Sequence, residues 1–318
     1  MAQNAALDIV VLAGGISHER DISLRSGRRV ADALNSLGHR VTFRDPDASL
    51  LAFLSENRPD VVWPALHGAS GEDGALRSLL ELTGIPFVGS RTDASRLAWS
   101  KPAAKTVVAR AGVATPASVV LPKETFRELG ANSVLATVLD GLGVPLVVKP
   151  AQGGSAQGVT IVEKADELPR AMVDAYTYAD VALIERKVSG IEVSVAVVDT
   201  GEGPEALPAV EIEPVGGAYT FDARYNAGET RFYTPARLDE TTAAAVAEAA
   251  TTAHVALGLR HLSRIDLIVD ADGVPWFLEA NVLPGLTETS IMPQAIAAAG
   301  RDLGDVYAAL ALAAIADA

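Results

Sequence analysis

Residues 264–281 read RIDLIVDADGVPWFLEAN, and this stretch decides which fold the chain is expected to have. Apolar residues alternate up to Val269, which is typical of a strand. The segment Asp270–Gly273 has the composition of a tight turn, and Pro275–Leu278 then reads as the returning strand. The pattern therefore predicts an antiparallel hairpin near the C-terminal end of the chain.

Three side chains that carry oxygen meet at one end of this hairpin. Glu279 and Asn281 lie two positions apart on one strand and so point to the same face, and the turn brings Asp266 opposite them. Carboxylate and amide oxygens suit a hard divalent cation such as Mg²⁺, which usually bridges to phosphate groups. A solvated hairpin with ordinary surface acids explains these residues as well, so the rest of the chain must decide.

The composition of the 318 residues excludes several classes of protein. The length fits two or three domains, and a hydrophobic content of 49% excludes a disordered chain. The absence of cysteine excludes disulfides, thiolate catalysis and cysteine zinc sites. A net charge of −14 argues against a nucleic-acid partner. No apolar run is long enough to span a bilayer and no signal peptide is evident, so we expect a cytoplasmic protein without a membrane partner.

The order of expected elements predicts a mixed architecture, part α/β and part α+β. In residues 1–98, short apolar strands alternate with helices, which predicts a parallel sheet with helices on both faces. Residues 99–187 predict a smaller α+β unit. Residues 188–318 combine long antiparallel strands, a long helix and the hairpin. We expect domain boundaries near Trp99 and Lys187.

A glycine-rich loop follows the apolar strand that ends at Lys149. Residues 151–158 read AQGGSAQG. Glycines let backbone N–H groups converge on anionic oxygens, and a lysine adds a point charge, so this loop is a candidate phosphate-binding hairpin. A flexible hairpin tip beside a partly buried lysine is the structural alternative. Neither GxxxxGK[ST] nor GxGxxG is found, which argues against the folds that carry those nucleotide-binding loops.

Other segments carry further candidate residues. Glu185 lies at the end of an expected strand, and Glu192 follows it. A carboxylate there could accept hydrogen bonds from ribose, although a solvated strand end explains these residues as well. Residues 219–235 are polar and aromatic, as expected of a lid or of an ordinary surface loop. Gly285 could offer a backbone N–H to an oxyanion, and Ser290 could cap the next helix or meet an anion there.

Together these segments resemble the D-alanine–D-alanine ligases of the ATP-grasp superfamily. The resemblance covers essentially the whole chain and rests on motifs in the expected order, which lie at residues 14–24, 66–74, 148–158, 264–266 and 279–287. It implies an ATP-grasp fold with an N-terminal parallel-sheet domain, called the pre-ATP-grasp domain. It also implies a reaction for peptidoglycan precursor synthesis. The carboxylate of one D-alanine attacks the γ-phosphate of ATP, the amine of a second D-alanine attacks the resulting acylphosphate, and phosphate leaves.

The resemblance further implies a set of site residues. Those expected at the nucleotide are Lys101, Lys149, Ser155, Ala156, Glu185, Arg186, Lys187, Glu192 and Arg224. Those expected to hold Mg²⁺ or Mn²⁺, as two ions, are Asp266, Glu279 and Asn281. Those expected in catalysis are Glu19, Ser155, Tyr225, Arg264, Gly285 and Ser290. The implied partners are ATP, two molecules of D-alanine and a second copy of the chain in a homodimer.

Each of the expected catalytic residues has an implied role. Glu19 takes the ammonium group of the first amino acid, and Ser290 holds the carboxylate of the second. Arg264 and the backbone of Gly285 stabilise the tetrahedral oxyanion. The hydroxyl groups of Ser155 and Tyr225, together with Glu19, latch the lid over the site. The presence of Tyr225 also favours an amine over a hydroxy acid as the acceptor.

A few positions depart from the family pattern and leave other functions open. Arg224 stands where a lysine is usual, which keeps the charge but changes its geometry. Ala156 replaces a serine, Arg77 stands where a glutamine is usual, and Glu288 is an unusual acid close to the expected pocket of the second substrate. A ligase of specialised metabolism that joins another amino acid pair, or a non-catalytic nucleotide-binding homologue, would explain such departures. The complete set of expected metal ligands argues against the non-catalytic reading.

Overall fold

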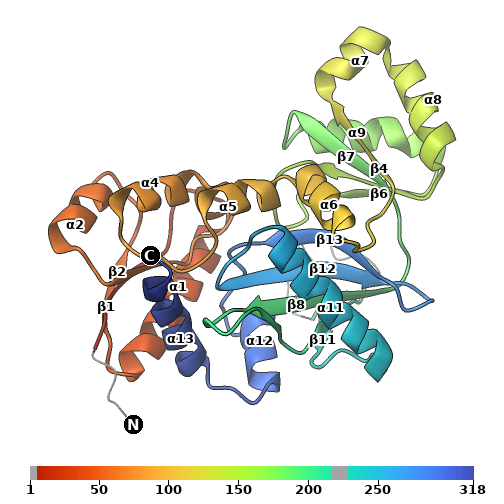
Figure 1. The fold of residues 1–318 in the computed structure, drawn as a ribbon. Helices are drawn as coiled ribbons and strands as arrows, with labels where there is room; N and C mark the ends of the chain where they lie inside the picture. Colours follow the sequence, from red (N-terminus) through yellow and green to blue (C-terminus); the bar gives the residue numbers. More distant parts are fainter. Residues whose placement is uncertain (1–5, 217–227) are drawn as a thin grey trace.

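The computed structural model describes residues 6–216 and 228–318 (Figure 1). Arg224 and Tyr225, which were expected in the site, lie outside the described residues, as does most of the candidate lid.

The N-terminal part is built on a three-stranded parallel sheet with the order β2-β1-β3. The central strand pairs through Ile9 with both Val41 and Val61. The elements are β1 (Asp8–Leu12), α1 (Arg20–Ser36), β2 (Arg40–Arg44), α2 (Leu50–Asn57), β3 (Val61–Pro64), α3 (Ala69–Glu72) and α4 (Ala75–Thr83). The predicted parallel sheet is confirmed. The sequence also predicts a further strand that starts at residues 84–86, and this prediction is wrong, because only a bridge between Val62 and Phe87 forms there and Pro86 has no N–H to extend the ladder.

The central part is a four-stranded antiparallel sheet with the order β4-β7-β5-β6. Its elements are β4 (Ser118–Pro122), α7 (Lys123–Leu129), α8 (Ala131–Leu142), β5 (Leu146–Pro150), β6 (Thr160–Val162), the 3₁₀ helix η1 (Ala165–Glu167), α9 (Leu168–Tyr176) and β7 (Val181–Arg186). Val148, Met172 and Ile184 belong to a core of its own. Figure 1 shows this part, with α7 and α8, standing clear of the other sheets. The glycine-rich loop joins β5 to β6.

The C-terminal part is a six-stranded sheet with the path β11-β10-β8-β12-β13 and β9 paired to β8. The strands are β8 (Ile191–Val198), β9 (Glu205–Ala206), β10 (Val210–Pro214), β11 (Thr230–Tyr233), β12 (Leu262–Val269) and β13 (Pro275–Asn281). The helices around it are α5 (Thr92–Trp99), α6 (Lys101–Arg110), α11 (Glu240–Ala256), α12 (Ile291–Ala298) and α13 (Leu303–Ala316). Alternate residues of β8 enter different cores, Val195 with α6 and α11 and Ala196 with α12 and α13.

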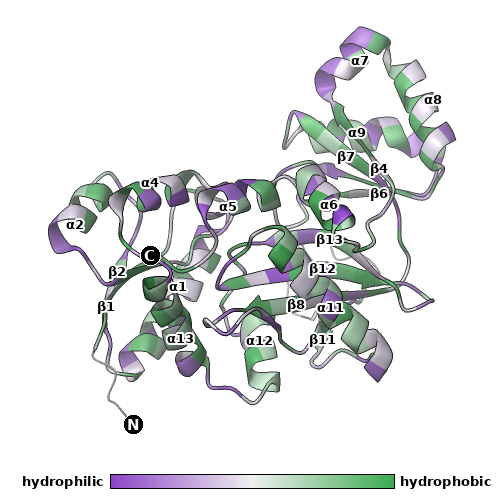
Figure 2. Cartoon of the chain, viewed as in Figure 1, coloured by the Kyte–Doolittle hydropathy of each residue, from purple (hydrophilic) through white to green (hydrophobic). Residues whose placement is uncertain are grey.

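The N- and C-terminal parts share one hydrophobic core. Trp63 of β3 packs on Tyr307 of α13, with ring centroids 5.2 Å apart. Few hydrophilic residues interrupt α12 and α13 (Figure 2). In the same way, Ala104 and Val108 of α6 pack against the C-terminal sheet, although α6 follows the boundary expected at Trp99. The division into residues 1–98, 99–187 and 188–318 stays a prediction. Among the helices that the structure describes, none is long and apolar enough to cross a membrane.

Candidate functional site

The register of the C-terminal hairpin places the expected metal ligands together. Asp266 of β12 lies directly opposite Glu279 of β13, and Arg264 lies opposite Asn281. The register shifts between Asp266 and Leu267, so a bulge separates this end of the hairpin from its turn. The sequence prediction that Asp266 faces the Glu279–Asn281 end is confirmed.

Asp266 is a buried carboxylate held from two directions. Arg264 donates from Nε to Oδ1 at 2.8 Å and from Nη2 to Oδ2 at 2.7 Å, which is the two-pronged geometry that a guanidinium allows. The hydroxyl of Ser194, on the neighbouring strand β8, also donates to Oδ1. These contacts fix the orientation of the carboxylate.

Glu279 and Asn281 complete the oxygen-bearing group. Glu279 Oε2 lies 2.9 Å from the Nζ of Lys101, and the amide oxygen of Asn281 accepts from the backbone N–H of Leu283 at 2.8 Å. Two carboxylates and an amide suit a hard divalent cation. Within the described ranges there is no cluster of three or more acidic or histidine side chains that could hold a metal ion. An ion here would therefore depend on the amide and on oxygens that a bound ligand brings.

A cavity of about 670 Å³ opens onto this end of the hairpin. Its walls are the glycine-rich loop, the end of β7 and the hairpin. The expected residues that line it are Lys101, Lys149, Ala156, Glu185, Arg186, Lys187, Glu192, Asp266 and Glu279. The predicted nucleotide residues and the acidic pair thus share one cleft, although they come from different sheets. A volume of this order is typical of a small-molecule or cofactor site.

Lys149 and Glu185 form a buried ion pair with an unexpected third member. Lys149 Nζ lies 2.5 Å from Glu185 Oε1, and Lys105 of α6 donates to Glu185 Oε2. Both oxygens of Glu185 are therefore engaged by lysines. Burial alone would raise the pKa of Glu185, but the two ammonium groups hold that pKa below its ordinary value. Lys105 is not among the residues predicted for the site, and its spacing from Lys101, one helical turn, is the sequence signal that could have indicated it.

Two further residues of the expected nucleotide set, Arg186 and Lys187, line the same cavity. Lys187 Nζ is 2.7 Å from Glu163 Oε1. Arg186 donates from Nε and Nη2 to the carbonyl of Leu142 at 3.2 and 3.1 Å. Both long side chains are therefore held by contacts within the central part.

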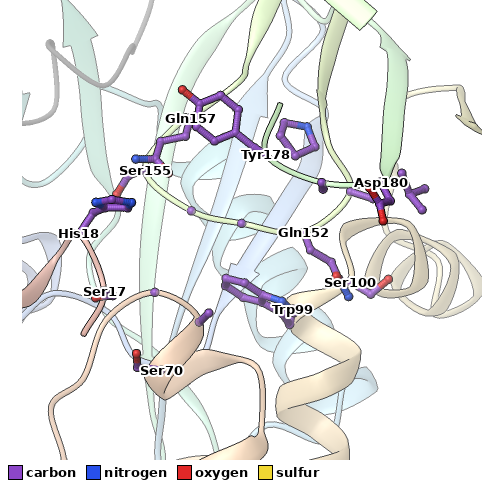
Figure 3. A pocket seen from close by; sticks show the side chains of 18 of the residues that line it. Ser17, His18, Ser70, Trp99, Ser100, Gln152, Ser155, Gln157, Tyr178 and Asp180 are labelled. Carbon is purple, nitrogen blue, oxygen red and sulfur yellow. The ribbon is translucent and has the colours of Figure 1, made fainter. Parts of the chain in front are cut away.

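The glycine-rich loop also faces a second cavity, of about 810 Å³. Figure 3 shows Ser17 and His18 from the N-terminal part, Gln152 and Ser155 from the loop, and Trp99 around this cavity. The hydroxyl of Ser155 donates to Glu19 Oε1, so the contact expected between these two residues is present. Ser155 has φ +53° and its neighbour Ala156 has φ +56°. Both lie in the left-handed backbone region, which residues other than glycine rarely adopt.

Glu19 lies beside a second acidic side chain, Glu72. Glu72 Oε1 accepts from the backbone N–H of Gly68 at 2.8 Å. Burial, and next the charge of Glu19, raise the pKa of Glu72 to about 8. Gly68 has φ +72°, a conformation that favours glycine, and a Cβ there would stand 3.0 Å from Glu19 Oε2.

His67 ties the N-terminal part to the loop after the hairpin. Its Nδ1 is 3.0 Å from the carbonyl oxygen of Leu283, and its Nε2 is 3.0 Å from the hydroxyl of Ser26. A carbonyl only accepts, so Nδ1 carries the proton and Nε2 accepts from Ser26. Burial lowers the pKa of His67, which keeps the ring neutral. Ser26 in turn accepts from the N–H of Leu286 at 3.1 Å, so this chain of bonds fixes the segment that contains Gly285.

Gly285 and Ser290 lie against each other at the start of α12. A Cβ on Gly285 would come within 2.7 Å of Ser290 Oγ. Ser290 Oγ accepts from the N–H of Thr287 at 3.1 Å and lies 2.8 Å from the hydroxyl of Thr287. Ser290 occupies the N-cap position, yet its side chain makes no capping bond. The expectation that its hydroxyl caps the helix is wrong, because the turn before the helix uses that hydroxyl.

Of the expected residues that the structure describes, Arg264, Asn281, Gly285 and Ser290 are not among the lining of the two cavities. Arg264 and Asn281 nevertheless adjoin the acidic pair through the hairpin register.

Two protein-family models match the chain. The model described as D-ala D-ala ligase C-terminus matches residues 107–311, and the model described as D-ala D-ala ligase N-terminus matches residues 51–90. The chain belongs to the D-alanine–D-alanine ligase family. The D-alanine–D-alanine ligase of Anaeromyxobacter sp. (strain K) is 41% identical over 298 residues, which cover 94% of each chain.

Solved structures of the D-alanine–D-alanine ligase family have the same fold. The VanG D-Ala:D-Ser ligase from Enterococcus faecalis matches with a TM-score of 0.84 and 27% identity, over 97% of this chain and 99% of that one. The D-alanine–D-alanine ligase from Bacillus anthracis complexed with ATP matches with a TM-score of 0.80 and 27% identity, over 98% of both chains. The predicted ATP-grasp fold with an N-terminal parallel-sheet domain is confirmed.

Two of the positions that depart from the family pattern lie away from the cavities. Arg77 is fully buried and donates from Nη1 to the carbonyl of Ser90 at 2.7 Å. The Glu288 side chain is 89% exposed, and its Oε1 lies 3.5 Å from Arg29 Nη1. Neither residue lines the cavities described above. Because Arg77 is enclosed within the protein and the Glu288 side chain projects into solvent, these two departures give little support to a different amino acid pair.

Proposed function

We propose that this protein is an ATP-dependent ligase that joins two D-alanines through an acylphosphate and releases ADP and phosphate. The observation that carries the proposal is the shared cleft. In a chain of this family, Lys101, Lys149, Asp266 and Glu279 line one cavity together with the glycine-rich loop. Cationic groups and backbone amides at one wall, and oxygen ligands at the other, are what phosphoryl transfer from a nucleotide requires.

The nucleotide would bind in this cleft with its phosphates toward Lys101 and Lys149. Both lysines are nearly buried, so their charges are weakly screened by solvent. The adenosine end would lie toward Arg186, Lys187 and Glu192 at the far wall. Ala156 would contribute a backbone group of the glycine-rich loop.

A divalent cation, Mg²⁺ or Mn²⁺, is proposed at Asp266, Glu279 and Asn281. The donor set fits such an ion, and the carboxylates stand opposite each other in the hairpin. When bound, one or two ions would offset the charge of the nucleotide phosphates. Arg264 and Ser194 hold the Asp266 carboxylate in place, and Lys101 holds Glu279.

The amino acids are proposed to bind between the cleft and the N-terminal part. Glu19, placed by Ser155 and adjacent to Glu72, supplies a carboxylate for the ammonium group of the first D-alanine. Arg264 and the N–H of Gly285 would stabilise the oxyanion of the tetrahedral intermediate. Ser290 would hold the carboxylate of the second D-alanine at the start of α12. Arg224 and Tyr225 are proposed to act in the lid. We further propose a cytoplasmic homodimer.

The experiment that tests this function supplies the purified protein with ATP, Mg²⁺ and D-alanine. Phosphate release and the mass of the dipeptide are measured together. We expect stoichiometric phosphate and D-alanyl-D-alanine, with neither formed when D-alanine is left out. D-serine, glycine and D-lactate are offered as alternative acceptors in parallel. Phosphate release only with a different amino acid, or no turnover with any of them, would overturn the proposal.

A further inference from the structure

Lys105 is a buried lysine to which the proposed reaction gives no role. It is 4% exposed and lies on α6, one turn after Lys101. Its ammonium group donates to Glu185 Oε2, while Lys149 approaches the other oxygen, Oε1, at 2.5 Å. The three charged groups therefore form a row in which Glu185 separates two lysines.

The members of this row differ in their access to the cleft. Lys149 and Glu185 line the nucleotide cavity, whereas Lys105 is not among its lining residues. The helix that carries Lys105 is held in place, because Ala104 and Val108 pack into the core of the C-terminal sheet. Lys105 therefore lies behind the lining of the cleft, where its ammonium group bonds to Glu185.

The balance of charge explains why a second lysine is needed there. A buried pair of Lys149 and Glu185 would be neutral, and the carboxylate would draw the Lys149 ammonium away from phosphate oxygens. Adding Lys105 gives the group one net positive charge, and the Lys105 ammonium bonds to one of the two carboxylate oxygens of Glu185. Glu185 is then satisfied at both oxygens, which a carboxylate buried at 2% exposure requires.

We propose that Lys105 is a positioning residue that holds Glu185 from behind and so keeps the charge of Lys149 available for the nucleotide phosphates. Lys105 itself touches neither the nucleotide nor the amino acids. The inference rests on the proposed function, because it assumes that Lys149 meets phosphate. It predicts that Lys105 matters for the phosphates of the ligand and not for its adenosine.

The test compares ADP and adenosine as ligands in the presence of Mg²⁺. Kd values are measured by calorimetry for ADP and by NMR titration for adenosine, in the wild-type protein and in the Lys105→Met variant. Losing one charge-assisted contact to phosphate weakens binding about 10- to 100-fold. We expect this loss for ADP and almost none for adenosine. A merely structural role of Lys105 would weaken both ligands alike.

Two further variants sharpen the comparison. Lys105→Met combined with Glu185→Gln removes one charge of each sign, so the group again carries one net positive charge, and the ratio of ADP to adenosine affinity should recover. Lys123→Met is the matched control, since Lys123 pairs with Asp180 at 2.5 Å on the surface of the central part. It should leave the ratio unchanged. Should Lys105→Met fail to fold, Lys105→Gln provides the same comparison with a smaller change in polarity.

The outcomes separate the inference from the proposed function. An unchanged ratio in Lys105→Met, or a lowered ratio that the double variant fails to restore, would overturn the role of Lys105. A wild-type protein that binds ADP no better than adenosine would instead overturn the phosphate site itself.

Discussion

Lys101 joins the acidic end of the C-terminal hairpin to the glycine-rich loop. Its Nζ lies 2.9 Å from Glu279 Oε2 and donates to the carbonyl of Gly153 at 2.6 Å. The same ammonium group is thus shared between a proposed metal ligand and the proposed phosphate loop. A divalent ion at Glu279 would compete with Lys101, and the displaced lysine would remain within the cleft and available to phosphate oxygens.

Glu279→Gln tests the metal site directly. The change keeps the shape of the side chain but removes the charge that both Lys101 and a divalent ion need. We expect phosphate release to fall at least about 100-fold, because a metal ion contributes several kcal/mol to such reactions. Steady-state rates across a range of Mg²⁺ concentrations are the measurement. Asp272→Asn is the matched control, since Asp272 is an exposed acid of the same hairpin. Equal losses in both variants would contradict the assignment.

The contact between Ser155 and Glu19 predicts a role for a hydroxyl group rather than for the backbone. Ser155→Ala removes the bond to Glu19 Oε1, and Ser155→Gly removes it while also favouring the left-handed backbone at φ +53°. A hydrogen bond to a charged group contributes about 1.5–3 kcal/mol, so kcat/KM for D-alanine should fall about 10- to 100-fold in both. Ser133→Ala, at an exposed serine of α8, should have no effect. Full activity of the glycine variant would show that loop geometry alone matters.

Local patterns carried much of the sequence prediction. The alternation of apolar residues, the turn at residues 270–273 and the spacing of Glu279 and Asn281 were enough to place Asp266 opposite Glu279. The glycine-rich loop between two strands was equally local. These features depend on neighbours in the sequence, and so a single sequence can indicate them.

Contacts between segments that are far apart in the sequence could not be predicted from such local patterns. The spacing of Lys101 and Lys105 places both lysines on one side of a helix, but no local pattern indicates that Lys105 of α6 meets Glu185 of β7, because that contact depends on how α6 packs against a different sheet. The bond of His67 to the carbonyl of Leu283 depends in the same way on how the N- and C-terminal parts dock. The use of the Ser290 hydroxyl within its own turn was missed because the N-cap rule predicts a different partner.

Arg264→Lys tests whether the shape of the cation matters as well as its charge. Arginine contacts both oxygens of Asp266, at 2.8 and 2.7 Å, and a lysine cannot reproduce this fork. If Arg264 also faces the oxyanion, kcat should fall about 100- to 1000-fold, the usual cost of losing one such donor. Single-turnover phosphate release measures it. Arg170→Lys is the control, because the Arg170 side chain is 90% exposed and its acidic contact, from Nε to Asp174 Oδ2, is long at 3.9 Å. If Arg264→Lys kept the kcat of the wild-type protein, the two-pronged contact between Arg264 and Asp266 would have no part in catalysis.

The raised pKa of Glu72 predicts how stability depends on pH. Burial and the nearby Glu19 move this pKa from 4.5 in the unfolded chain to about 8 in the folded protein. Below the lower value both states are protonated. Between the two values only the unfolded state releases the proton, so this group's contribution to stability is lost as the pH rises from 4.5 to about 8. Glu72→Gln replaces the titratable carboxyl group with a neutral amide and keeps an oxygen that can accept from the Gly68 N–H. The free energy of unfolding in urea, wild type minus variant, should therefore fall toward alkaline pH with a slope of up to about 1.4 kcal/mol per pH unit. A difference that stays constant across this range would mean that Glu72 is already ionised in the folded protein.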